Sequence, residues 1–294
     1  MRRIAVLAAV MAIAGAALYY GERSRADVPV TPAPLLHIIG DAEREATRVP
    51  MKMTRLSDEQ EIAAGNQIAA HYQLTMPKPY DADRRMADYI AEVGARLAAN
   101  AHRRLPYRFH YVPEMGFVNA FALPGGHIFI GKGLIALMDS EDELAGVLGH
   151  ELEHVDHYHC AERLQTEAIA RKIPLGSLAL LPIELFQAGY SKEQELEADR
   201  EGVRLASRSG YSALAAARLF ARMDKLYAER QTQSQTPQEE MSEVVVASLT
   251  EYFRSHPPAA ERIAQIRQVA ANERLPLREE RPLQVAVESE EAKR

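Results

Sequence analysis

The sequence predicts a mainly α-helical fold with a small β-sheet, an α+β protein. Apolar residues recur at helical spacing in several long stretches, and these stretches begin at residues that cap helices well. Between two of them lie three short runs rich in aromatic and β-branched residues, which indicate strands. The chain has 294 residues, of which 47% are hydrophobic and 26% charged, so it can bury a substantial core in one folded domain.

The first part of the domain is expected to hold two helices and the sheet. The helices cover residues 57–72 and 83–100. The strands are YRFHYVP, NAFALP and HIFIG, which start at residues 107, 119 and 127. The Pro-Gly-Gly sequence at 124–126 is expected to turn the second strand back toward the third.

A later apolar stretch, residues 173–186, is broken by Pro174 and Pro182 and is too short to span a bilayer. It fits either a core segment or a surface patch that meets a membrane or a partner.

The two ends of the chain differ in composition from the folded domain, which we expect over residues 51–272. Two arginines precede an apolar run of 17 residues, so residues 1–25 are expected to be a signal peptide or an N-terminal membrane anchor. Either would send the rest of the chain to the bacterial periplasm, and an uncleaved segment would bind the inner membrane. Residues 26–50 contain four prolines and are expected to form an extended linker, and the charge-rich residues 273–294 a disordered tail.

The overall charge and the cysteine count exclude some classes of protein. A net charge of −6 and a pI near 6.0 argue against nucleic acid as the partner. The single cysteine excludes an internal disulfide, so cysteine usage does not identify the compartment.

The strongest chemical signal is a histidine pair on an expected helix that begins at Ser140, where Glu143 completes a capping box. His150 and His154 are four residues apart, so their side chains point the same way and can share one metal ion. Glu151 follows the first histidine, and the pattern His-Glu-x-x-His on a helix is typical of zinc peptidases, in which the glutamate is the general base.

The pattern needs a third ligand. One class of such enzymes takes a third histidine six residues after the second, with a glycine three residues after it. Here those positions hold Cys160 and His157, so this class is disfavoured. His157 and His159 are expected to be ordinary surface or core histidines.

A later helix, over residues 191–209, supplies carboxylates instead. Glu195 and Asp199 lie one turn apart on a face of small or apolar residues, where burial is costly unless a cation or hydrogen bonds compensate. Glu195 is therefore the expected third ligand and Asp199 an acceptor for a ligand histidine. Gly202 on the same face is expected to let this helix lie close to the His150 helix. The other charged residues of this helix are expected to be solvated: Glu193, Glu197, Arg200, Glu201, Arg204 and Arg208.

These motifs resemble the HtpX-type and CAAX-prenyl-endopeptidase family of zinc metallopeptidases. The likeness lies in HELEH (150–154) and ELEAD (195–199). It extends upstream to SDEQEIAAGNQIA, YIAEVGARLA and VNAFALPGGHIFIGKGLI, and downstream to SHPPAAERI. It implies a zincin-like fold with the two motif helices packed together, one Zn²⁺ per chain, and cleavage of peptide bonds in misfolded or membrane-associated proteins. In layout the chain is most similar to periplasmic quality-control members.

The resemblance also suggests two further groups of site residues. An edge strand at Asn119, Ala120 and Phe121 would bind an extended substrate by backbone pairing, although a plain structural hairpin explains these residues equally well. His256, in the His-Pro-Pro sequence, would reach the zinc site either as a donor to the oxyanion or as a fourth ligand that blocks it. The alternative is that His256 only precedes a helix.

Two other functions remain open from the sequence. The chain could be a zinc-binding chaperone or assembly adaptor with little proteolysis. It could also be a structural zinc protein whose remaining position is filled by His256 or Cys160. Glu151 argues against both, because a structural zinc site does not require a general base.

Overall fold

The computed structural model describes residues 56–284, apart from 79, 174–180, 233–248, 250–251, 254–255 and 257–258. The expected signal or anchor segment, the linker and the two prolines after His256 lie outside the described residues. No helix among the described residues is long and apolar enough to cross a membrane.

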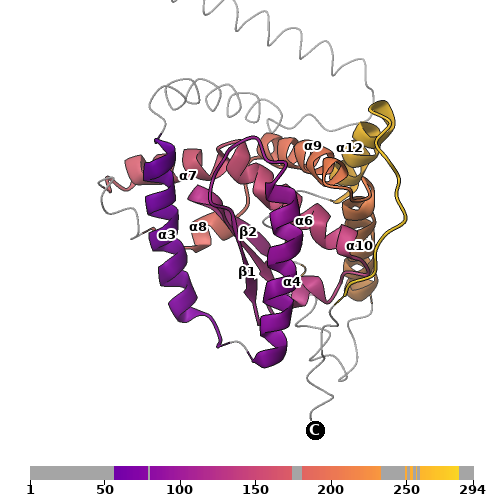
Figure 1. Cartoon of the computed structure of the whole chain (residues 1–294), viewed down its shortest axis with the longest axis horizontal. Helices are drawn as coiled ribbons and strands as arrows, with labels where there is room; N and C mark the ends of the chain where they lie inside the picture. The colour runs from indigo at the N-terminus through magenta and orange to yellow at the C-terminus, as the bar shows by residue number, and fades with distance from the viewer. Residues whose placement is uncertain are drawn as a thin grey trace, which may run out of the picture. The chain divides into compact units, whose positions relative to one another are not determined.

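The predicted α+β fold is confirmed: the described chain is mostly helical, with one three-stranded sheet (Figure 1). The elements are α3 (Asp58–Thr75), α4 (Asp81–Ala98), β1 (Arg108–Val112), β2 (Ala120–Leu123), the 3₁₀ turn η1 (Pro124–Gly126), β3 (His127–Gly131), α5 (Lys132–Ile135), α6 (Glu141–Asp156), α7 (His159–Ala170), α8 (Glu184–Gln187), α9 (Lys192–Arg208), α10 (Ala215–Thr232) and α12 (Ala259–Asn272).

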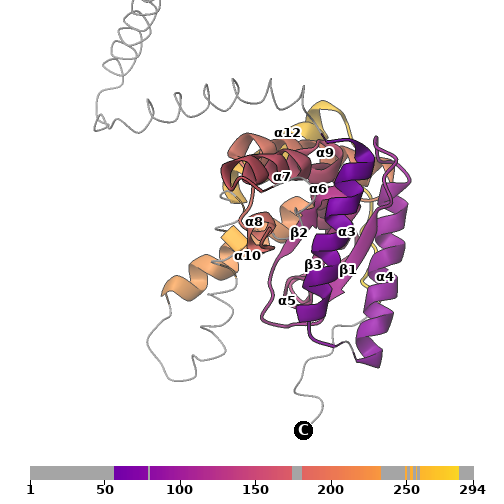
Figure 2. The ribbon, with the colours of Figure 1, turned by 90° about the vertical axis from the view of Figure 1, so that its left-hand side faces the viewer.

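The sheet has the strand order β1-β3-β2, with β1 parallel and β2 antiparallel to β3. The expected turn joins β2 to β3, and Gly125 and Gly126 have φ values of +75° and +102°, which favour glycine. Helix α3 packs on this turn, where the buried carboxylate of Glu61 accepts the backbone N–H of Gly125 at 3.0 Å. Figure 2 shows α3 and α4 beside the sheet.

Helix α6 lies at the centre of the domain and is buried along its whole length. It contacts the sheet through β2 and β3, and it contacts α4, α9 and α10. Ser140 caps it by accepting the N–H of Glu143, but the Glu143 carboxylate accepts the N–H of Asp139 instead of that of Ser140. The expected capping box is therefore only half formed.

Helices α6 and α9 cross in close contact at two glycines. A Cβ atom on Gly202 would lie 3.0 Å from the backbone nitrogen of His150, and one on Gly149 would lie 3.3 Å from the carbonyl oxygen of Gly202. The role predicted for Gly202 is confirmed. Helix α9 has a full capping box at Ser191 and ends at Gly210, where φ is +89°. This close crossing brings the side chains of the two motif helices together.

Residues 273–284 differ from the expected disordered tail. The carbonyl of Arg281 accepts the N–H of Glu141 at 2.9 Å, and the Asp142 carboxylate accepts the N–H of Arg281 at 3.0 Å. The Arg281 guanidinium also reaches the Glu141 carboxylate. The two carboxylates at the start of α6 are buried, so they need partners, and this segment supplies them. A charge-rich composition alone does not reveal such pairing.

The described part of the apolar stretch 173–186 belongs to the core. Leu181 and Phe186 are buried in a cluster that includes Phe121 and Phe129 of the sheet. Residues 174–180 lie outside the described residues.

Candidate active site

The structure brings the three expected metal ligands together in the protein interior. His150 and His154 project from α6 and Glu195 from the first turn of α9. The two Nε2 atoms lie 3.1 Å apart. Glu195 Oε2 is 3.4 Å from His150 Nε2, and its Oε1 is 3.6 Å from His154 Nε2.

This donor set fits a zinc ion. Zinc bonds of about 2.0–2.1 Å at tetrahedral angles place ligand atoms roughly 3.3 Å apart, and the three observed separations lie close to this value. Glu195 is fully buried, yet its Oε2 has no hydrogen-bond partner among the residues that the structure describes. Such an atom is costly unless a cation accepts its charge.

The charges around the site fit a divalent cation as well. Three buried carboxylates, those of Glu151, Glu195 and Asp199, lie among the described residues of the site, with one buried guanidinium, that of Arg262. When the imidazoles are in the neutral form that binds metal, these four groups carry two more negative than positive charges, which a divalent cation neutralises.

Asp199 lies behind His150, as predicted. Its Oδ1 is 3.0 Å from His150 Nδ1, the nitrogen that does not face Glu195. Arg262 of α12 binds the same carboxylate with two hydrogen bonds, from Nε at 2.8 Å and from Nη2 at 2.7 Å. No site role was expected for Arg262 from the sequence, whereas the structure shows it paired with Asp199 and stacked on Phe220.

His154 has a corresponding support that the sequence analysis missed. Its Nδ1 lies 2.9 Å from Nδ1 of the buried His159, and His159 Nε2 lies 3.2 Å from the Glu197 carboxylate. When Nδ1 of His154 is protonated, it donates a hydrogen bond to Nδ1 of His159. His159 Nε2 then carries the proton of that ring and donates a hydrogen bond to Glu197. His159 is thus a buried core histidine, one of the two kinds expected, but its contact with His154 was not predicted, and Glu197, which was expected to be solvated, is only 33% exposed and pairs with it. Tyr190 stacks on His154 at 4.0 Å between ring centroids.

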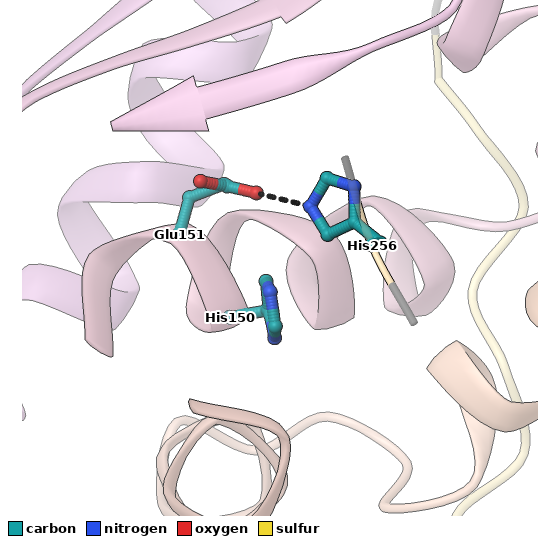
Figure 3. Close-up of side chains that lie close together, drawn as sticks. All are labelled: His150, Glu151 and His256. Atoms are coloured by element: carbon teal, nitrogen blue, oxygen red, sulfur yellow. Dashed lines mark ion pairs between the residues drawn. The ribbon is translucent and has the colours of Figure 1, made fainter. Parts of the chain in front are cut away.

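Glu151 and His256 face each other beside His150, as Figure 3 shows. His256 Nε2 lies 3.7 Å from Glu151 Oε1, and the His256 ring stacks on Tyr252. The Nδ1 atom of His256 contacts the Tyr252 carbonyl at 3.2 Å. Of the two nitrogens, Nε2 is thus the one directed at the site.

Charged neighbours control the protonation of the buried groups. Burial alone would raise the pKa of Glu195, but the neighbouring imidazoles of His256 and His150 lower it to about 2. Burial alone would also raise the pKa of Asp199, and Arg262 lowers it well below its usual range. Burial and the neighbouring histidines lower the pKa of His154. Glu195 and His154 are thus held in the forms that bind metal. Burial and Arg262 alone would lower the pKa of His150, but its hydrogen bonds to Asp199 and Glu195 raise it to about 9, so a metal ion must displace a proton there.

The proposed substrate strand and Cys160 lie differently from the metal ligands. β2 is an edge of the sheet, but Asn119, Ala120 and Phe121 are only 4%, 2% and 2% exposed, and α8 packs against the strand.

Cys160 is buried, with Sγ 3.1 Å from the Tyr190 hydroxyl, and among the described residues it belongs to no group that could hold a metal ion.

Comparisons with known proteins agree with this geometry. The family model described as Peptidase family M48 matches residues 84–270. The chain is 33% identical over 178 residues to a β-barrel assembly-enhancing protease of Yersinia pestis, which covers 53% of this chain and 36% of that protein. It is 33% identical over 147 residues to the mitochondrial metalloendopeptidase OMA1 of Schizosaccharomyces pombe, which covers 46% of this chain and 43% of the relative.

A third relative, the metalloprotease YcaL of Escherichia coli K12, is 26% identical over 238 residues, which is 74% of this chain and 82% of the relative. By contrast, the matched region spans well under half of the assembly-enhancing proteases from Yersinia pestis and Vibrio cholerae, 36% and 39% of their lengths.

Proposed function

The chain belongs to peptidase family M48 and is a metalloprotease, and we propose that it is a zinc metalloendopeptidase whose site is built from His150, Glu151, His154 and Glu195. The observation that carries this proposal is the fully buried Glu195 Oε2, which accepts no hydrogen bond from any described residue and lies 3.4 Å from His150 Nε2. When bound, zinc supplies Lewis-acid activation of the water and of the scissile carbonyl.

In this proposal each side chain has a separate task. His150, His154 and Glu195 hold the ion, and Asp199 and His159 keep the two imidazoles in the tautomer that presents Nε2. Glu151 accepts a proton from the attacking water and later delivers it to the leaving amine. The nearly complete burial of these groups strengthens every charge interaction among them.

We assign His256 the role of a donor to the oxyanion that forms on the scissile carbonyl. Its Nε2 faces the site from the side of Glu151, which supports this assignment. The same position supports the opposite role, in which His256 becomes a fourth ligand and blocks the site, because one ligand atom each of His150, Glu151 and His256 lie within 4.8 Å of one another.

We propose misfolded or membrane-associated envelope proteins as the substrates, cleaved in the bacterial periplasm. Two observations support this: the apolar N-terminal run, and the relatives whose names refer to β-barrel assembly. For such substrates, β2 at the sheet edge is the proposed pairing strand. Because α8 covers it, we expect α8 to move before Asn119, Ala120 and Phe121 can bind a peptide.

A single set of measurements tests the proposed function: hydrolysis of unfolded casein and the zinc content of the purified chain. Glu151→Gln keeps all three ligands and removes the base, so it should keep its zinc and lose at least about 10²–10⁴-fold in activity. Glu195→Ala should lose the active-site zinc ion and the activity, whereas Glu193→Ala on the exposed side of the same turn should lose neither. Undiminished cleavage by Glu151→Gln would contradict the mechanism. Zinc binding without cleavage by the wild type would favour the chaperone or adaptor alternative.

A further inference from the structure

Glu153 is a buried carboxylate that the active site does not use. It lies one position before His154 on α6, and its side chain is 0% exposed. Neither of its oxygens has a hydrogen-bond partner, and this is the only carboxylate among the described residues for which both oxygens are so identified. Leaving a buried carboxylate without hydrogen bonds is costly, so a compensating charge is expected nearby.

Arg103, a basic residue beside the end of α6, does not supply that charge. Arg103 lies beside Asp156, but its guanidinium binds the carboxylates of Asp58 and Glu61. His157 Nε2 lies 3.3 Å from Glu153 Oε2 and forms an ion pair with it when the imidazole is protonated. That nitrogen also makes no hydrogen bond of good geometry.

Two further potential ligands surround the Glu153 carboxylate. They are Asp156, one turn further along α6, and His102, in the connection between α4 and β1. One ligand atom from each of the three residues lies within 4.8 Å of the other two. His102 Nδ1 is 3.5 Å from Asp156 Oδ2. The group thus combines an imidazole with two carboxylates, the ligand types that borderline divalent cations such as zinc accept.

We propose that Glu153, Asp156 and His102 form a second site for a divalent cation of the zinc class, separate from the active site. None of its ligands belongs to the active-site set. The side chain of His102 is 64% exposed, so it is free to swing onto an ion that enters from solvent, while Asp156 and Glu153 are fixed in the interior.

Asp156 is already partly satisfied, which limits what it can contribute. Its Oδ1 accepts the N–H of Arg103 and the hydroxyl of Tyr107, and its Oδ2 accepts the N–H of His102. One lone pair on Oδ2 remains for an ion. A bound ion would join the end of α6 to the connection that follows α4, so it should stabilise the fold without taking part in the cleavage of substrates.

Zinc stoichiometry in the full-length chain tests the site. The wild type should hold two zinc ions per chain and Glu195→Ala one. His102→Ala and the isosteric Glu153→Gln should each hold one and keep full casein hydrolysis. His71→Ala, a change at an exposed histidine of α3, should still hold two. The thermal midpoint of the wild type should rise with added zinc beyond the first equivalent, and that of His102→Ala should not.

The outcomes separate this proposal from the proposed function. One zinc in the wild type, one in His102→Ala and none in Glu195→Ala would overturn the second site and leave the active site intact. Two zinc ions without proteolysis would support the second site and contradict the proposed function. If Glu153→Gln fails to fold, His102→Ala decides alone, because its exposed side chain supports no core contact.

Discussion

Nδ1 of His159 lies 2.9 Å from Nδ1 of His154, on the side of the His154 ring that faces away from Glu195. Without His159, the orientation and the tautomer of the His154 ring should no longer be fixed. We therefore expect His159→Ala to weaken zinc binding about 10–100-fold, measured by competition with a chelator.

Glu197 provides a graded control for the same interaction. Glu197→Gln keeps an oxygen that can accept a hydrogen bond from His159. The Gln variant should therefore lose less zinc affinity than Glu197→Ala. Glu193→Ala should match the wild type. Wild-type affinity in His159→Ala would show that His154 is oriented by its stacking on Tyr190 instead.

The pair formed by Asp199 and Arg262 predicts a separation between metal affinity and stability. Arg262→Gln leaves a buried carboxylate without its main partner, which should cost roughly 3–5 kcal/mol in the free energy of unfolding. Asp199→Asn keeps an oxygen for the Arg262 guanidinium, so it should lose less stability, while it should weaken zinc binding roughly 10–100-fold. Urea unfolding and chelator competition measure the two effects. Arg267→Gln, a change at an exposed arginine of the same helix, is the matched control for the first.

His256→Ala distinguishes the two roles of this histidine. As the oxyanion donor, its loss should lower kcat about 10²–10³-fold with little change in KM. As a blocking ligand, its loss should raise kcat. The measurements are kcat, KM and zinc content, and wild-type values of all three would assign His256 a structural role beside Tyr252.

A chain of hydrogen bonds across the sheet predicts a loss of stability in acid. Gln73 of α3 lies 3.0 Å from Nδ1 of His110, His110 Nε2 lies 2.9 Å from Nδ1 of His127, and His127 Nε2 lies 2.9 Å from Asn66. Burial lowers the pKa of both histidines to about 4. In the unfolded chain they titrate near pH 6.5.

Between these pH values the unfolded chain binds more protons, so the free energy of unfolding should fall as the pH decreases from about 6.5 to about 4. In His127→Gln one of the two groups is absent, and this fall should be shallower. Urea unfolding of both proteins across the range isolates the effect, because the metal ligands are common to both. Parallel curves would contradict the assignment.

The sequence predicted the part of the site that depends on helical periodicity. The spacing of His150 and His154 and the small face around Glu195 are properties of regular helices, and the structure places these groups together. His159 is different. On a continuous helix it would point about 140° away from His154, but Tyr158 adopts a left-handed conformation with φ of 64° and ends α6. The chain then returns His159 toward His154.

Helical periodicity also could not predict the contacts of Arg262 and Glu197. Arg262 and Asp199 are 63 residues apart in the sequence, and no local pattern links them. Glu197 lies on the face of α9 that was expected to be solvated. It gains its partner only because α7 begins beside that face. Both cases depend on how separate helices pack, which the sequence pattern of one helix does not contain.

The pairing of Arg262 with the group behind His150 has a consequence for biosynthesis. Arg262 and His150 are 112 residues apart. During synthesis, His150 and His154 are therefore added long before Arg262, the residue that binds the Asp199 carboxylate. A nascent chain that has not reached Arg262 carries the ligand helix without this partner, so its affinity for the metal should be lower until Arg262 has been added and has paired with Asp199.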